Sequence, residues 1–212
     1  MRLSINIFTT KKIMKNLIYV ISLFFGLIVN AQTNLPKSAT EISPLLIGEE
    51  IPSVILQSID GKNIKFDDIA KSKKTILVIY RGGWCPYCNL HLSALGEAEE
   101  KLIEMGYQII AVSPDSPESL RETIIKDKLN YTLLSDSKGD FTKALGIAYI
   151  IPNGLKKNVK RILHGVKNDF LPVPSLFIVN EKSEIEFEYI SPDYKTRISN
   201  ELLLAVATIL KK

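Results

Sequence analysis

The feature that most constrains the fold of this chain is a pair of cysteines, Cys85 and Cys88, at the junction between an apolar segment and a segment with helical periodicity. Residues 75–80 form a continuous apolar, β-branched run, which is typical of a strand covered on both faces. After the pair, apolar residues recur at helical intervals until Gly106, which predicts a helix over residues 86–105. A buried strand that delivers two cysteines to the start of a helix indicates an α/β arrangement.

The alternation of strand and helix patterns continues along the chain. Apolar segments at residues 54–57 and 64–66 flank the turn dipeptide Asp60-Gly61 and predict a hairpin. Further strands are expected at 107–112, 131–134, 176–179 and 184–189, and helices at 117–128, 140–145 and 201–210. This order predicts an α/β fold with a central mixed, mostly parallel sheet, flanked by helices and preceded by a hairpin. The basic residues 152–169 are expected to form a surface excursion.

The length of 212 residues suits one domain with one core. Near the N-terminus, lysines precede an apolar run over residues 17–29, and small or apolar residues occupy the positions that a signal peptidase reads before Gln32. The run is shorter than the roughly 20 residues that span a bilayer, so a cleaved signal is favoured over a membrane anchor. We expect a signal peptide over 1–31, with Met14 as an alternative start, an extended leader over 32–47 and one domain over 48–212. The mature protein is expected in the periplasm or another extracytoplasmic space, and to meet the membrane only during export.

The formal net charge of +4 is accounted for by four basic residues among the first 15. The remainder is balanced and has no basic stripe with interleaved aromatic residues of the kind that binds a phosphate backbone. Nucleic acid is therefore not an expected partner.

The spacing of the two cysteines points to redox chemistry. Cys85 falls at a helix N-terminus, where unpaired N–H groups and the helix dipole favour a thiolate, so it is the expected nucleophile. Cys88 lies almost one turn further on the same face and is the expected resolving thiol. Pro86 is tolerated because an N–H in the first turn has no intrahelical partner.

Two other uses of the cysteine pair stay open. A structural disulfide that closes so short a loop would stabilise the fold little. A zinc site needs four ligands, and only His91 and His164 could supplement the pair, each of which is more often a core or solvated histidine. We assign no metal and no cofactor.

The segment from Trp84 to Cys88 resembles the active sites of thioredoxin and glutaredoxin, which implies a thioredoxin-like fold with Trp84, Pro86 and Tyr87 beside the substrate. Val173-Pro174-Ser175 resembles the cis-proline turn that faces the cysteines in that fold. The resemblance implies that Pro174 is cis and that the Val173 backbone pairs with an extended partner chain, as a strand would. An ordinary trans proline at a strand entry is the alternative.

A wider resemblance covers most of the expected mature chain. The chain is similar to peroxiredoxin-like proteins of the alkyl hydroperoxide reductase and thiol-specific antioxidant (AhpC/TSA) family, in which Cys85 takes the peroxidatic position and a thioredoxin-type donor restores the thiols. The matching segments are Gly48-Glu49-Glu50-Ile51-Pro52 with the hairpin, Tyr80-Arg81-Gly82-Gly83-Trp84-Cys85-Pro86-Tyr87-Cys88, Leu133-Leu134-Ser135-Asp136 with Gly139, and the segment from Val173 to Val179.

The chain departs from that family at the positions that hold the peroxide. Val78 and Gly82 stand where the family has a proline and a peroxide-orienting hydroxyl, and Pro174 falls where it has a pocket arginine. Arg81 or Arg197 is left to supply positive charge near the substrate, although a solvated arginine is the commoner state for each.

Three functions follow from these observations. The first is a thiol-dependent antioxidant oxidoreductase that reduces hydroperoxides through Cys85 and Cys88. The second is a thiol-disulfide oxidoreductase that acts on protein disulfides without peroxidase activity. The third, of another class, is a binding module that holds a soft metal through the two thiolates.

Overall fold

The computed structural model describes residues 34–156 and 169–211. The chain divides into two units, Met1–Asn34 and Leu35–Lys212, and the fold described below is that of the second. The expected signal peptide, His164 and most of the basic excursion lie outside the described residues.

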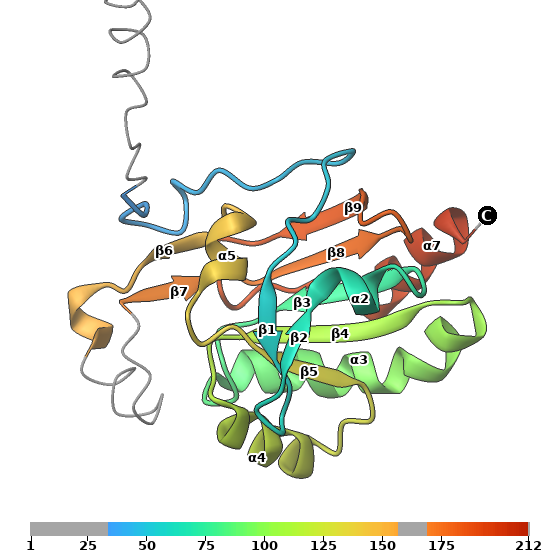
Figure 1. The fold of residues 1–212 in the computed structure, drawn as a ribbon, viewed down its shortest axis with the longest axis horizontal. Coiled ribbons are helices and arrows are strands. Elements are labelled where there is room, and N and C mark those ends of the chain that lie inside the picture. The colour runs from blue at the N-terminus through green and yellow to red at the C-terminus, as the bar shows by residue number, and fades with distance from the viewer. Residues whose placement is uncertain (1–33, 157–168, 212) are drawn as a thin grey trace, which may run out of the picture. The chain divides into compact units, whose positions relative to one another are not determined.

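A seven-stranded mixed sheet forms the centre of the domain, with strand order β2-β1-β5-β4-β3-β8-β9 (Figure 1). Strands β3, β4 and β5 are parallel, whereas the pairs β1–β2, β1–β5, β3–β8 and β8–β9 are antiparallel. The predicted mixed sheet is confirmed, but the expectation that it is mostly parallel is wrong, because parallel pairing is confined to β3–β4 and β4–β5 and the other four pairs of this sheet are antiparallel. In the order of the sheet, the strands are Asn63–Lys65, Ile55–Gln57, Thr132–Ser135, Gln108–Ser113, Thr75–Ile79, Ser175–Val179 and Ile185–Ile190.

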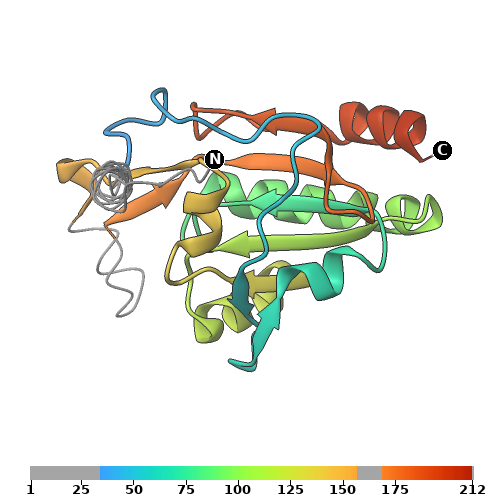
Figure 2. The same ribbon diagram turned by 45° about the horizontal axis from the view of Figure 1, so that its top comes forward.

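Helices cover both faces of this sheet because its central strands are apolar on both sides. Ile76 and Val78 of β3 face one core, which includes apolar residues of α3, α4 and α7. Leu77 and Ile79 face the other core, which α2, α5 and strands β6 and β7 complete. The orange strand β8 can be followed beside β3 in Figure 2. The helices are α2 (Phe66–Ala70), α3 (Pro86–Glu104), α4 (Pro117–Asp127), α5 (Asp140–Ala144) and α7 (Asn200–Leu210), and the second, two-stranded sheet pairs β6 (Ala148–Ile150) with β7 (Phe170–Pro172).

The observed elements follow the predicted ones closely, with two exceptions. Phe66, expected at the end of a strand, begins the short helix α2 instead and packs against Phe141 at 4.8 Å between ring centroids. The pair β6–β7 was not predicted, because its strands are short and lie on either side of a long basic segment that masks their relation in the sequence.

The expected leader is not a separate extended segment. The Ser43 and Leu45 N–H groups donate to the carbonyls of Gly146 and Leu145, and Ile42 packs against the core. Gly146 has φ of +70°, and a Cβ there would lie 1.9 Å from the Ser43 carbonyl oxygen. The apolar side chains scattered through the polar leader therefore attach it to the domain.

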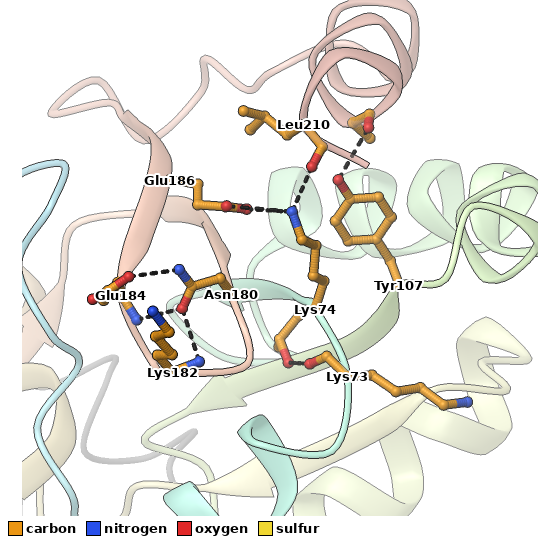
Figure 3. Close-up of polar contacts among 10 residues, drawn as sticks. Lys73, Lys74, Tyr107, Asn180, Lys182, Glu184, Glu186 and Leu210 are labelled. Atoms are coloured by element: carbon orange, nitrogen blue, oxygen red, sulfur yellow. Dashed lines mark hydrogen bonds and ion pairs between the residues drawn. The ribbon is translucent and has the colours of Figure 1, made fainter. Parts of the chain in front are cut away.

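Polar contacts tie the start of β3 to the C-terminal helix (Figure 3). Lys74 Nζ lies 3.0 Å from Glu186 Oε2 on β9 and also donates to the Leu210 carbonyl. The Tyr107 hydroxyl donates to the Ala207 carbonyl at 3.0 Å. Within residues 34–156 and 169–211, no helix has both the length and the apolar character needed to cross a bilayer.

Candidate active site

The two cysteines occupy the positions that the sequence predicts. Strand β3 ends at Ile79, and Cys85 is the N-cap residue of α3, with φ −90° and ψ 112°. The N–H groups of Cys88 and Asn89 donate to the Cys85 carbonyl at 3.0 and 3.1 Å, which closes the first turn of the helix. Both cysteines are free thiols, and their exposed fractions are 1% and 0%. The structure thus places a dithiol at the end of a buried strand and the start of a 19-residue helix.

The two thiols have opposite electrostatic surroundings. The hydrogen bond from the Cys88 thiol lowers the pKa of Cys85 to about 6, with further help from the positive charges of Arg81 and Arg197, although burial opposes the shift. Donating that hydrogen bond raises the pKa of Cys88 well above its usual value, and burial and the Cys85 charge raise it further. Cys85 is therefore the more nucleophilic thiol at neutral pH, and Cys88 holds its proton.

The loop before Cys85 is fixed by hydrogen bonds and by the absence of side chains at its two glycines. The Gly83 N–H donates to Asp115 Oδ2 at 2.8 Å, and Asn89 Nδ2 donates to the Gly83 carbonyl at 2.9 Å. Gly82 has φ of +135°, and a Cβ there would lie 2.5 Å from Trp84 Nε1. The peroxide-orienting hydroxyl of the family pattern therefore has no room at this position.

The expectation of solvated arginines is wrong for Arg81. Its exposed fraction is 3%, and its guanidinium lies 4.4 Å from the ring centroid of Tyr194 and 4.9 Å from that of Trp84. Arg197 is half-buried, and its Nη2 lies 3.5 Å from Cys88 Sγ. Aromatic stacking compensates for the lost hydration of a guanidinium, which is why a buried arginine is tolerated here.

The expectations for Pro174 and Val173 are not met. Pro174 is trans, since the described residues contain no cis peptide bond, and the trans isomer is the lower in energy for most X–Pro bonds. Val173 is fully buried, its N–H donates to the Ile147 carbonyl at 2.9 Å, and its carbonyl accepts a bond from Ser175 Oγ. The Val173 N–H and carbonyl, which were expected to pair with a partner chain, are therefore hydrogen-bonded within the domain.

The remaining site residues lie around the entrance to the dithiol. Trp84 is half-buried and donates from Nε1 to the Arg81 carbonyl at 3.1 Å. Pro86 and Tyr87 are exposed, and the Tyr87 ring meets Tyr194 edge-on at 5.8 Å between centroids. Pro86 and Tyr87 are thus the expected substrate-side residues that solvent reaches most readily.

The sequence did not single out Asp115, Tyr149 or Tyr194. Burial raises the pKa of Asp115 to about 6, against hydrogen bonds from Gly83 and Ser113. Burial also raises the pKa of Tyr149, whose phenol interacts electrostatically with Arg81 and Cys85. These residues come from strands or loops far from Cys85 in the chain, so the spacing of residues around the cysteine pair could not indicate that they lie near it.

A metal site is not supported by the described residues. They contain no group of three or more His, Cys, Asp and Glu side chains that could hold an ion. His91, expected to be either a core or a solvated histidine, is a core histidine, and burial with the nearby Arg197 charge lowers its pKa to about 4.

Comparison with known proteins agrees with this geometry. The family model described as AhpC/TSA family matches residues 47–188. Peroxiredoxin Bcp of Escherichia coli K12 is 23% identical over 163 residues, covering 77% of this chain and 96% of its own length. Peroxiredoxin bcp1 of Schizosaccharomyces pombe is 30% identical over 112 residues, covering 52% of this chain and 56% of its own length. The crystal structure of reduced Prx3 in complex with H2O2 from Vibrio vulnificus superposes with a TM-score of 0.66 at 17% identity, covering 77% of this chain and 99% of that one.

Proposed function

The chain belongs to the AhpC/TSA family, and from that premise we propose that it is a thiol-dependent peroxidase, an antioxidant oxidoreductase that reduces hydroperoxides through a dithiol-disulfide cycle of Cys85 and Cys88. The observation that carries the proposal is the Cys85 thiol at the N-terminus of α3, whose pKa is lowered to about 6. Such a sulfur is a thiolate at neutral pH, and the thiolate is the form that attacks a peroxide oxygen.

The first half of the cycle oxidises Cys85. Its sulfur attacks the terminal oxygen of the hydroperoxide, an S–O bond forms and the O–O bond breaks. The other oxygen leaves as an alcohol or water after taking up a proton, and Cys85 becomes a sulfenic acid. Arg81, buried beside Trp84 and Tyr194, stabilises the negative charge at this end of the strand without a hydroxyl at position 82.

The second half of the cycle joins the two cysteines. Cys88 attacks the Cys85 sulfur, an S–S bond forms and the S–O bond breaks. The leaving hydroxide combines with the proton of the Cys88 thiol and departs as water. A dithiol donor of the thioredoxin type then reduces the disulfide, and the exposed Pro86 and Tyr87 are the surface on which we place that donor.

One assay panel tests the proposal. Purified wild type, Cys85→Ser and Cys88→Ser are compared for consumption of H2O2 and an organic hydroperoxide with a thioredoxin and its reductase. We expect steady turnover by wild type, none above background by Cys85→Ser, and one equivalent of peroxide consumed by Cys88→Ser followed by loss of turnover. A wild type no faster than Cys85→Ser would reject a peroxidase, and turnover of insulin disulfides in the same preparation would then favour the disulfide reductase.

The proposed place of action is outside the cytoplasm. Support comes from the lysines, the 13-residue apolar run over 17–29 and the small residues before Gln32. Mass spectrometry of the protein from fractionated cells tests this, with a mature N-terminus at Gln32 in the extracytoplasmic fraction as the expected result. An intact N-terminal segment on protein in the cytoplasmic fraction would contradict export.

A further inference from the structure

The segment between β9 and α7, residues 191–199, forms a fixed turn beside the dithiol. Ser191 Oγ donates to the Asp193 carbonyl at 2.9 Å, and the Thr196 N–H donates to the same carbonyl at 3.0 Å. The Lys195 N–H donates to Asp193 Oδ1 at 3.1 Å. Asp193 thus holds the turn from within, and the side chains that the turn carries are presented in a defined direction.

Two side chains of this turn reach the active site. Tyr194 packs on the Arg81 guanidinium and on the edge of Tyr87. Arg197 donates from Nη1 to the carbonyls of Tyr194 and Thr196, both at 2.6 Å, and its Nη2 lies 3.5 Å from Cys88 Sγ. Two backbone carbonyls therefore fix the guanidinium in an orientation that points its other nitrogen at the resolving sulfur.

The Arg197 charge is available to that sulfur. Among the described residues, no carboxylate lies within ion-pair distance of Arg197. Cys88 is fully buried, so its thiolate would have to form without hydration and needs a nearby cation or donor. The His91 imidazole, which lines a surface pocket together with Arg197, stays neutral at physiological pH and supplies no charge.

We propose that Arg197 is a catalytic residue of the disulfide half of the cycle, in which it stabilises the thiolate of Cys88. This inference rests on the proposed dithiol cycle. Arg197 also helps Arg81 to lower the pKa of Cys85, but the sulfur that its guanidinium contacts is that of Cys88. Nothing in the local sequence pairs Cys88 with a residue 109 positions later.

Arg197 acts at two points in the cycle. When Cys88 attacks the Cys85 sulfenic acid, its S–H proton passes to the leaving hydroxide, and Arg197 stabilises the charge that grows on Cys88 Sγ. When a donor thiolate attacks Cys85 Sγ of the disulfide, the S–S bond breaks toward Cys88, which leaves as a thiolate beside Arg197. The same attack forms a mixed disulfide between the donor and Cys85, and a proton from solvent restores the Cys88 thiol. The second thiol of the donor then attacks the donor sulfur of the mixed disulfide, Cys85 leaves as a thiolate, and the donor becomes a disulfide.

The experiment compares Arg197→Gln with Arg197→Lys, which keeps the charge, and with Lys195→Gln, which removes an exposed cation from the same turn. In the Cys85→Ser background, the pH dependence of Cys88 alkylation reports its pKa without any peroxide. We expect Arg197→Gln to raise that pKa by about one unit or more, the range for losing an opposite charge in close contact. Arg197→Lys is expected to restore part of the shift, and Lys195→Gln to leave it unchanged.

A second measurement uses the intact dithiol. After addition of one equivalent of H2O2, a cyclic dione traps the Cys85 sulfenic acid that is present at each time point. Conversion of the sulfenic acid to the disulfide is measured in parallel, from the loss of free thiols. Arg197→Gln is expected to form the sulfenic acid within about twofold of the wild-type rate and to convert it about tenfold more slowly, the factor that a one-unit pKa shift implies.

The two measurements separate the two hypotheses. If wild type forms no sulfenic acid, the proposed peroxidase fails, while the alkylation profile of Cys88 still tests Arg197. The role of Arg197 would be overturned if Arg197→Gln left the pH dependence of Cys88 alkylation unchanged. It would also be overturned if Arg197→Lys shifted that dependence as far as Arg197→Gln does.

Discussion

The two ends of strand β3 each carry a basic side chain, and the two cations have opposite surroundings. At the start of the strand, Lys74 is bound to a carboxylate on Glu186 and to the Leu210 carbonyl (Figure 3), and about a fifth of its side chain is exposed. Past the end of the strand, Arg81 is buried between two aromatic rings and has no carboxylate within ion-pair distance among the described residues. The two residues are seven positions apart, which corresponds to about 23 Å of extended chain.

This contrast separates structural charge from functional charge. A partly exposed ion pair such as that of Lys74 contributes up to about 1 kcal/mol of stability, and the Glu186 carboxylate neutralises the lysine charge. A buried cation without a carboxylate is costly to keep and leaves its field free for another anion. At this end of the strand that anion is the Cys85 thiolate, so the unpaired charge of Arg81 is available to stabilise it.

The largest effect that tests the contrast is the pH dependence of Cys85. With a pKa of about 6, the rate of reaction of the reduced protein with H2O2 should be flat above about pH 7.5 and about thirtyfold lower at pH 4.5. Stopped-flow rates across that range measure it, and a midpoint near 8.5 would contradict a stabilised thiolate. The lowered pKa also implies stability in the reduced protein that is present at alkaline pH and lost as pH falls through about 6, whereas the disulfide form lacks it.

Removal of the Arg81 charge should come next in size. Arg81→Gln is expected to raise the pKa of Cys85 and to slow its reaction at pH 6 by about fivefold, because one opposite charge near a thiolate is worth about one pKa unit and the thiol is already half protonated at that pH. Alkylation of Cys85 against pH in the Cys88→Ser background measures it. Lys74→Gln, at the other end of β3, is the matched control. An equal shift of the Cys85 pKa in both variants would contradict the distinction between the two cations.

Packing of the active-site loop predicts a third effect. A Cβ on Gly83 would lie 2.1 Å from Thr123 Oγ1 of α4, so Gly83→Ala should destabilise the fold by about 1–3 kcal/mol, the usual cost of overpacking. Gly96→Ala is the control, because a Cβ there meets nothing within 4 Å and alanine suits the middle of α3. Urea unfolding of both variants measures the change in the free energy of unfolding. An equal change at Gly83 and Gly96 would show that the loop accommodates the added methyl group without strain.

The smallest effect is expected at the structural end of β3. Lys74→Gln should lower the free energy of unfolding by about 1 kcal/mol at low salt and less at high salt, with peroxide turnover unchanged. Thermal unfolding and the peroxide assay measure the two quantities. Lys73→Gln, which removes the neighbouring charge, is expected to change stability by less than about 0.5 kcal/mol.

Much of the fold could be predicted because its signals are local. The run 75–80 and the periodicity after Pro86 placed β3, α3 and the cysteine pair within a residue or two of their observed positions. The pair β6–β7 and the packing of the leader could not be predicted, because each depends on contacts between segments with weak patterns of their own. The trans state of Pro174 and the internal pairing of Val173 likewise depend on neighbours that spacing does not reveal.

The sequence by itself determined that this chain has one dithiol, that Cys85 begins a helix after a buried strand, and that Cys88 follows it on the same face. It did so because strand burial, helix period and the tolerance for proline in a first turn are properties of consecutive residues. Only the tertiary structure decided which charges surround the two sulfurs. Arg81 is buried by rings from its own loop and from a turn more than a hundred residues later, and Arg197 reaches Cys88 from that same turn. Electrostatic fields act through space, so the reactivity of a thiol is set by the fold around it as well as by its motif.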